Sequence, residues 1–370
     1  MKRFLAFVLL LFNSSFLFAH IEQLFFLEGT LGNKPIAMRI HREEDLYHGE
    51  YFFLSDKKNI SFRGECNSKD CLLSVFVMNQ ETHKEESTEV FRISENNDHT
   101  WSGTWRKGSN TVNILLKPID VSKFNHPYKD LPFIKSLDPY SYVRTSELKF
   151  SAVRTKKING ITVEWLKETI SGVEFIRLGK GLPTEVLNKV NTTLTGLHLA
   201  KSEGSFWCNP STTNLKDYKF IFNISLLNKS ILSLTALTTS NCFATTPETT
   251  TENITLDIKT GQQLSLEDIF YAGNKTIPAV NSAEWFDYRY KTFGAIIHKL
   301  LLNEYPDKMK ASTGACSYNK DEAWQFPDWK LGEKGLLVKA FLPDYLHCEK
   351  SEEFLIPYTK LEEYRKREIR

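Results

Sequence analysis

Short runs of alternating apolar and polar residues fill the first third of the chain, and they constrain its fold more than any other feature. Alternation with a period of two is typical of a strand that buries one face. Turn clusters such as 95–98 separate the runs, which lie at 36–40, 51–53, 73–77, 91–93, 101–105 and 112–116. Short strands at this spacing predict an antiparallel all-β meander over residues 20–118, closed as a small barrel or sandwich.

The rest of the chain mixes strand and helix patterns. Residues 119–147 contain Pro127, Pro132 and Pro139 without a regular period, and we interpret them as a linker. Alternating runs at 161–165, 220–226, 232–236, 335–341 and 354–356 then predict strands. Because helices separate these runs, we expect an α+β domain over 148–370, with a mostly antiparallel sheet packed by two helices.

The two helices are predicted from their apolar faces. The first begins at Pro183, and the second extends from Ser282 to Tyr305, where Pro306 ends it. We expect the second helix to bury one stripe of side chains, formed by Phe286, Tyr290, Phe293, Ile297, Leu300 and Leu301.

A segment at 254–270 has a particularly clear local pattern. Its apolar residues alternate up to Ile258, and Gly261 then supplies a turn residue that tolerates positive φ. Ser265 lies three residues before Asp268, a spacing typical of a helix start with reciprocal capping. The pattern predicts a strand, a tight turn and a short helix, and places no side chain for chemistry.

This segment resembles the signature of the DUF3298 family, whose domain also occurs in the lysozyme-sensing anti-sigma factor of Gram-positive bacteria. The strand at 231–242 and the closing strands at 335–361 resemble the same family, and 153–218 resembles the DUF4163-like region that often precedes it. The resemblance implies an exported domain, and one member of the family recognises lysozyme. Residues 242–246, Cys-Phe-Ala-Thr-Thr, depart from the Gly-Gly-Ala-His-like loop of the family, so no function of that loop is carried over.

The start of the chain predicts export. Residues 1–19 combine Lys2 and Arg3, an apolar run and Ala19 before the expected cleavage, as in a secretory signal peptide. No cysteine follows for a lipid anchor, so we expect a periplasmic or secreted protein. Loss of Lys2 and Arg3 from the 47 basic residues leaves 45, which equals the 45 acidic ones. A net charge near zero argues against nucleic acid as a partner.

An even number of cysteines in an exported chain predicts disulfides. Cys66 and Cys71 flank a short loop and form the pair that the spacing favours most. Pairing by sequence neighbourhood further suggests Cys208 with Cys242 and Cys316 with Cys348, although six cysteines allow many other connectivities.

Motifs for catalysis, cofactors and metals are not found in the sequence. The chain lacks a Gly-x-Ser-x-Gly elbow, a phosphate loop, an HExxH helix and a CxxC pair. His41 and His48 lie near Glu43 and Glu44, but their spacing matches no known metal site. We therefore expect a protein without enzymatic activity, cofactor or metal.

The loop at 342–353 is the best candidate for binding. A tyrosine among carboxylates on a disulfide-held loop suits a basic protein such as lysozyme, and cell-wall glycan is the other ligand that we consider. The candidate residues are Asp344, Tyr345, His347, Glu349, Glu352 and Glu353. An ordinary surface loop is the alternative interpretation of these residues. The alternative functions are a peptidoglycan-acting enzyme or accessory subunit, and a structural envelope protein.

Overall fold

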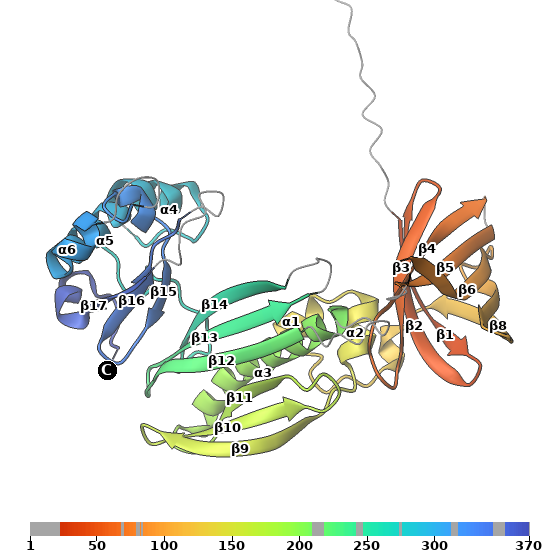
Figure 1. Ribbon diagram of the computed structural model, residues 1–370. Coiled ribbons are helices and arrows are strands. Elements are labelled where there is room, and N and C mark those ends of the chain that lie inside the picture. Colours follow the sequence, from red (N-terminus) through yellow and green to blue (C-terminus); the bar gives the residue numbers. More distant parts are fainter. Residues whose placement is uncertain are drawn as a thin grey trace, which may run out of the picture. The chain divides into compact units, whose positions relative to one another are not determined.

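The computed structural model describes residues 23–67, 70–78, 82, 84–208, 218–241, 247–273, 276–311, 317–342 and 352–369. The chain forms two compact units (Figure 1). The barrel unit comprises Met1–Leu54 and Ile60–Ile119, and the mixed unit comprises Ser55–Asn59 and Asp120–Arg370. Each unit is therefore assembled from segments that are not continuous in sequence.

The barrel unit is a closed antiparallel barrel in which each strand pairs with the next and β1 pairs with β8. The predicted all-β meander is thereby confirmed, in its barrel form. Its strands are β1 (Gln23–Leu31), β2 (Lys34–Glu43), β3 (Leu46–Phe53), β4 (Ile60–Asn67), β5 (Asp70–Met78), β6 (Glu85–Glu95), β7 (Trp101–Lys107) and β8 (Asn110–Pro118).

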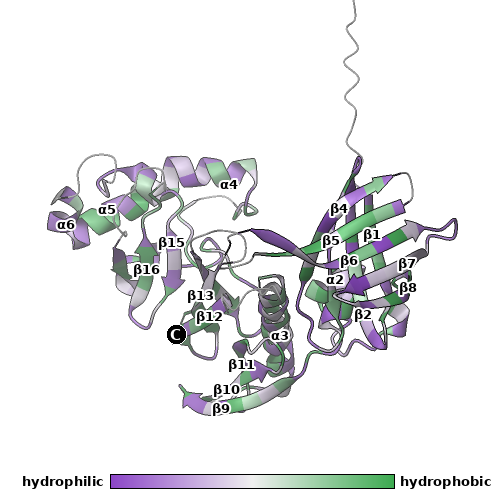
Figure 2. Ribbon diagram, turned by 45° about the vertical axis from the view of Figure 1, so that its right-hand side comes forward, coloured by the Kyte–Doolittle hydropathy of each residue, from purple (hydrophilic) through white to green (hydrophobic). Residues whose placement is uncertain are grey.

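Alternate side chains of the strands fill the barrel, as the period of two requires. Met38, Tyr51, Phe91 and Trp101 are almost completely buried there, and Figure 2 shows apolar and polar residues intermixed along the strands. Gly103 lies where β7 approaches β6 so closely that a Cβ atom would collide with the Arg92 carbonyl oxygen. A glycine at this position lets the sheet curve into a barrel.

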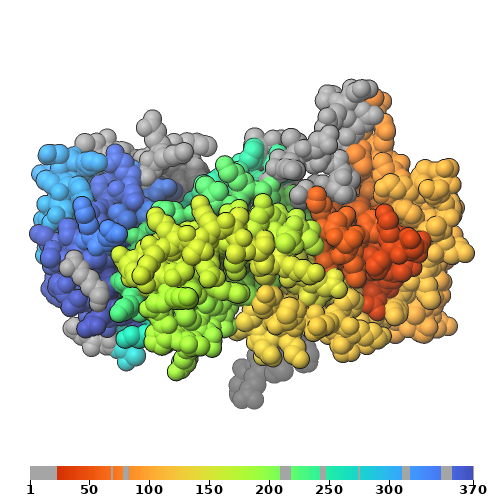
Figure 3. Space-filling view, turned by 90° about the horizontal axis from the view of Figure 1, so that it is seen from below, coloured from red at the N-terminus to blue at the C-terminus, as the bar shows by residue number. Residues whose placement is uncertain are grey.

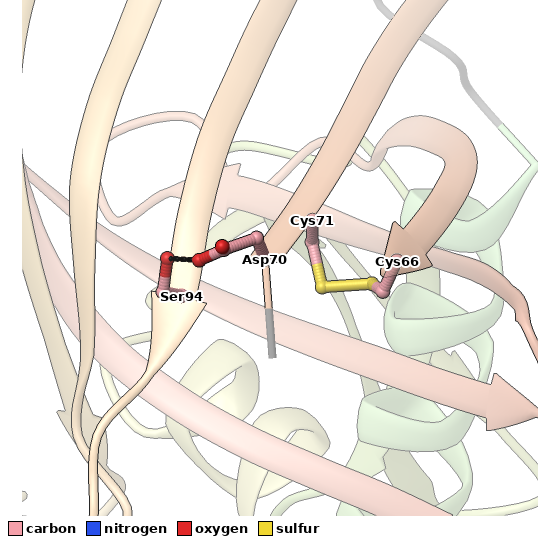
Figure 4. The surroundings of a disulfide bond; sticks show 4 residues. All are labelled: Cys66, Asp70, Cys71 and Ser94. Carbon is pink, nitrogen blue, oxygen red and sulfur yellow. Dashed lines mark hydrogen bonds between the residues drawn. A yellow bond between two sulfur atoms is a disulfide. The ribbon is translucent and has the colours of Figure 1, made fainter. Parts of the chain in front are cut away.

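The Cys66–Cys71 disulfide joins directly opposed positions of β4 and β5, which confirms the first predicted pairing (Figure 4). Both cysteines are buried in the barrel core. On the neighbouring strand, Ser94 of β6 donates a hydrogen bond to the Asp70 carboxylate. The disulfide closes a short connection, and we infer that it stabilises the barrel by limiting the unfolded chain.

The mixed unit begins with short helices in the segment predicted as a linker and continues into two three-stranded sheets. Its first elements are η1 (Val121–Lys123), α1 (Pro132–Lys135), α2 (Pro139–Thr145), β9 (Phe150–Ile158), β10 (Ile161–Glu168), β11 (Glu174–Leu178), α3 (Thr184–Trp207), β12 (Tyr218–Leu227), β13 (Ile231–Ser240) and β14 (Glu248–Asp257). The sheet orders are β11-β10-β9 and β12-β13-β14, and both sheets are antiparallel.

Helix α3 and the two sheets share one core. Val190 and Leu194 of α3 pack with Val163 of β10 and with Leu234 and Ile254 of the second sheet. The helix begins at Thr184, beside the expected start at Pro183, and its buried residues follow the helical period. This arrangement confirms the α+β prediction and resolves the expected sheet into separate three-stranded sheets.

The segment at 254–270 forms a strand and a tight turn but no helix. The Asp257 carboxylate accepts hydrogen bonds from the backbone N–H groups of Lys259 and Thr260, at 2.7 and 3.1 Å. Ser265 and Asp268 form the predicted reciprocal cap, with N–O distances of 2.8 and 3.2 Å. The expected short helix is wrong: the chain makes one hydrogen-bonded turn and then a β-bridge at Phe270.

The last part of the mixed unit packs helices against a third antiparallel sheet, of order β15-β16-β17. Its elements are α4 (Ala283–Tyr288), η2 (Arg289–Phe293), α5 (Gly294–Glu304), α6 (Pro306–Ala311), η4 (Asp321–Trp324), β15 (Asp328–Leu331), β16 (Gly335–Lys339), β17 (Glu353–Pro357), η6 (Tyr358–Lys360) and η7 (Glu362–Tyr364). Trp324, Phe354 and Leu301 lie in the common core of these elements.

A buried polar cluster ties Ser55–Asn59 to α2 and α3 within the mixed unit. The Asn59 Oδ1 atom accepts hydrogen bonds from Arg144 Nη1 at 2.6 Å and from the Tyr140 hydroxyl at 2.7 Å. Arg144 is fully buried, pairs with Glu203, and lies 4.3 Å from the centre of the Trp207 ring. Burial lowers the pKa of the neighbouring Lys57.

Within the described residues, none of the helices combines the length and the apolar character needed to cross a membrane.

Candidate functional site

Four aromatic side chains gather at the surface of the mixed unit. Trp285 and Phe286 lie on α4, Tyr290 lies on η2, and Phe326 follows η4. The Phe326 ring centre is 5.5 Å from Trp285, 5.9 Å from Phe286 and 5.3 Å from Tyr290. We call these four residues the aromatic cluster. Phe286 and Tyr290 remain 39% and 55% exposed, which is unusual for rings in mutual contact.

The exposure of these two rings contradicts the predicted buried stripe of a single helix. The helical segment is divided into α4, the π-helical η2 and α5, because the Gly294 N–H donates to the Arg289 carbonyl five residues back. A π-turn adds a residue and shifts every later side chain around the axis. Phe293, Ile297 and Leu301 consequently face the core, whereas Phe286 and Tyr290 face solvent.

Two features place Phe326 against the helix. Gly294 allows η4 to approach closely, since a Cβ atom there would come within 2.9 Å of the Asp321 carbonyl oxygen. The guanidinium of Arg289 donates a hydrogen bond of 3.3 Å to the Gln325 carbonyl oxygen. The residue preceding Phe326 is thus fixed to η2, the element that carries Tyr290.

Arg289 is itself bound by a residue of the segment at 254–270. Its Nε atom lies 2.6 Å from the Glu267 carboxylate, and both side chains are buried. The guanidinium also lies between the rings of Trp285 and Phe293, at 5.0 and 4.2 Å from their centres. Sequence reasoning assigned no role to Glu267, yet this carboxylate orients the arginine that supports the aromatic cluster.

A surface hollow of about 770 Å³ adjoins the aromatic cluster. Tyr290, Phe326, Phe341 and Leu342 supply its apolar wall, and Phe341 is 57% exposed. Its polar wall includes Asp321, Glu322, Gln325, Lys320 and Ser317. An apolar concavity with a few polar groups at its rim is the usual form of a ligand site.

His298 borders this region from α5. Its Nδ1 atom is 2.6 Å from the Asp321 carboxylate and its Nε2 atom is 3.1 Å from the Asn319 side-chain oxygen. Both ring nitrogens therefore have a polar partner, which holds the imidazole ring against Asn319 and Asp321. The contacts fit a histidine that fixes the η4 segment.

The predicted binding loop at 342–353 directly follows this hollow, since Leu342 belongs to its wall. Asp344, Tyr345, His347 and Glu349 lie outside the described residues. Glu352 and Glu353 are described, and each makes a salt bridge with a lysine of the chain: Lys308 at 2.6 Å and Lys330 at 2.5 Å. Contact with Glu352 raises the pKa of Lys308.

The other predicted sites are resolved in part. Cys208 is disulfide-bonded, and its expected partner Cys242 lies outside the described residues, as do Cys316 and Cys348. His41 and His48 are directly opposed on β2 and β3, with stacked rings 4.8 Å apart. The part of the chain that the structure describes contains no set of three side chains able to hold a metal ion.

Comparison with known proteins gave one kind of match. No family model matches the chain. No curated protein matches it either. Among solved structures, a member of the DUF3298 family from Bacteroides fragilis is similar to the chain, with 12% sequence identity and a TM-score of 0.34. The similarity covers 59% of this chain and 94% of that structure.

Proposed function

We propose that this protein is an exported, non-catalytic binding protein of the cell envelope, and that its ligand is a cell-wall glycan. We place the ligand on the aromatic cluster and in the adjoining hollow. The observation that carries the proposal is the exposure of Phe286 and Tyr290 beside that hollow. The predicted signal peptide and the Cys66–Cys71 disulfide support the compartment.

The aromatic cluster suits the face of a sugar ring. The faces of aromatic rings carry partial negative charge, which attracts the weakly positive C–H groups on the apolar face of a pyranose. Asp321, Gln325 and Ser317, which line the same hollow, supply acceptors and donors for sugar hydroxyls. The aromatic rings can thus contact the apolar face of a sugar, and the polar side chains can form hydrogen bonds with its hydroxyls.

Charge favours a glycan over a basic protein such as lysozyme. Attraction of a basic partner requires carboxylates that are not already neutralised. Glu352 and Glu353 are each within 2.6 Å of a lysine nitrogen. The described part of the predicted acidic loop therefore offers little uncompensated negative charge, whereas the aromatic cluster remains available to a neutral ligand.

A pull-down on purified peptidoglycan sacculi tests the proposal. The mature chain should bind sacculi, and the double variant Phe286→Ala/Tyr290→Ala should bind at least about tenfold more weakly, which corresponds to ~1.4 kcal/mol. Ile221→Ala removes an equally exposed apolar side chain from β12 and should bind like the wild type. Melting curves of each variant establish that the fold is retained.

The same assay separates the alternatives. Binding and inhibition of soluble lysozyme, with no retention on sacculi, would show that the ligand is a protein. Release of soluble glycan fragments from the sacculi would show that the protein is an enzyme. Equal retention of the wild type and the double variant would remove the aromatic cluster from the proposal, and binding to none of these ligands would leave only a structural role.

A further inference from the structure

Strand β9 is an open edge of the mixed unit. It is the last strand in the order β11-β10-β9, and within the described residues it pairs only with β10. All residues from Ser151 to Lys157 are exposed. Figure 3 shows the surface of this part of the chain, coloured yellow. An edge of this kind presents unpaired backbone N–H and C=O groups to a further strand.

The open edge is strongly basic. Residues 149–157, Lys-Phe-Ser-Ala-Val-Arg-Thr-Lys-Lys, contain four cationic side chains and no acidic one. Arg154 stacks on the Trp165 ring, 4.5 Å from its centre, while Lys156 and Lys157 have no carboxylate partner among the described residues. Some other exposed lysines, such as Lys189 and Lys308, pair with a glutamate.

Val153 adds an apolar contact to this edge. The register between β9 and β10 shifts at Trp165 and Leu166, so Val153 has no partner on β10. Its side chain is 51% exposed. A strand added along β9 would therefore meet an exposed apolar side chain and, next to it, cationic side chains. A peptide with both apolar and acidic residues can contact both kinds of side chain.

We propose that β9 binds an extended acidic peptide segment of a partner protein as a fourth strand of the sheet. Backbone hydrogen bonds to the open edge would hold the segment, and its carboxylates would lie beside Lys156 and Lys157. Charge selects this occupant against a second copy of the chain, because pairing of two β9 strands would place cationic side chains against each other. This proposal is independent of the glycan site.

Fluorescence anisotropy with synthetic peptides tests the proposal on the mature chain. The probe is a labelled peptide of alternating Glu and Val residues, and its affinity should fall with increasing salt. Lys156→Glu/Lys157→Glu should weaken binding by about tenfold or more, because attraction becomes repulsion. Lys219→Glu/Lys229→Glu, which reverses two exposed charges on and beside β12, should leave the affinity unchanged.

Three further probes decide whether strand pairing is involved. A peptide with Lys in place of Glu and an acidic peptide interrupted by proline should both fail to bind, the second because proline removes backbone donors. Equal binding of dextran sulfate and the proline peptide would overturn the proposal in favour of a general polyanion surface. Absence of binding by the Glu–Val peptide, or salt-dependent dimers of the protein alone, would also overturn it.

Discussion

Asn59 provides the sharpest test of how the mixed unit is held together. Its Oδ1 atom accepts hydrogen bonds from Arg144 and Tyr140 at 2.6 and 2.7 Å, and the side chain is buried. Asn59→Ala removes the acceptor of both hydrogen bonds. A hydrogen bond to a charged donor contributes ~1.5–3 kcal/mol and a neutral one ~0.5–1.5 kcal/mol, so we expect a loss of about 3 kcal/mol.

Thermal unfolding measures this loss. For a unit of this size, about 3 kcal/mol lowers the melting temperature by ~6–12 °C. Tryptophan fluorescence is a suitable probe, because one of the seven tryptophans, Trp207, stacks on Arg144 within the cluster. The two units need not melt together, so the loss is measured on the transition that shifts between the wild type and the variant.

Two variants sharpen the interpretation. Asn188→Ala makes the same substitution at an exposed position of α3 and should change the melting temperature little. Asn59→Asp keeps an oxygen acceptor beside Arg144 and should lose much less stability than Asn59→Ala. A loss below about 1 kcal/mol in Asn59→Ala, or a loss equal to that of Asn188→Ala, would refute the assigned role of this cluster.

Further predictions concern the support of the aromatic cluster, the turn and the pH response. Glu267→Gln should lower the free energy of unfolding by about 3 kcal/mol in urea titrations, since it leaves the buried Arg289 without its carboxylate, and should weaken sacculus binding. Gly261→Ala should destabilise by ~1–2 kcal/mol in the same titrations, because its φ is +74° and a Cβ atom would press on the α3 backbone. Burial lowers the pKa of His198 from 6.5 to about 4, so the unfolded chain takes up the proton first and stability falls as the pH drops between these values. Unfolding measured across this pH range should show a smaller loss in His198→Gln, with part of the slope retained by His126, whose pKa burial also lowers to about 4.

Hydrophobic periodicity predicted the parts of the fold in which one face is buried. Six barrel strands, β10 and β12 contain alternating runs, because their inner residues meet a core and their outer residues are more exposed. Strands β1 and β4 were not predicted, and β13 is buried without alternation from Ile231 to Leu234. Strand β9 was not predicted, because it is exposed on both faces and its sequence has no reason to alternate. Its conformation depends on hydrogen bonds to β10, which lies next in the chain.

The aromatic cluster was hidden from sequence reasoning for a different reason. Phe286 and Tyr290 fit the apolar stripe of a regular helix, but the π-turn at Arg289–Phe293 rotates the residues that follow, so these two rings do not share a face with Ile297 and Leu301. The π-helical conformation at Arg289 depends on contacts of its side chain with Glu267 and Gln325, which lie far away in the sequence. The sequence did contain one signal of exposed aromatic rings. Residues 285–293 hold more aromatic side chains than one buried face of a helix can accommodate.

The prediction of a binding loop at 342–353 took an incomplete view of charge. Leu342 does belong to the wall of the hollow, so the loop begins at the proposed site. The carboxylates of Glu352 and Glu353 seemed in sequence to be available to a basic partner. Lys308 and Lys330, which neutralise them, are distant along the chain and are brought to them by α6 and β15.

The assignment of Ser55–Asn59 to the mixed unit has a consequence for the order of synthesis. The barrel unit is complete in the nascent chain once Ile119 has emerged, but Ser55–Asn59 must then wait for Arg144 on α2 and Phe206 on α3. A connection between two finished strands thus stays without its polar partners while about 25–90 further residues are made, or several seconds at typical elongation rates. Folding of the barrel alone cannot bury Lys57 or Asn59. The mixed unit must pack against Ser55–Asn59, a segment that was translated before the rest of that unit.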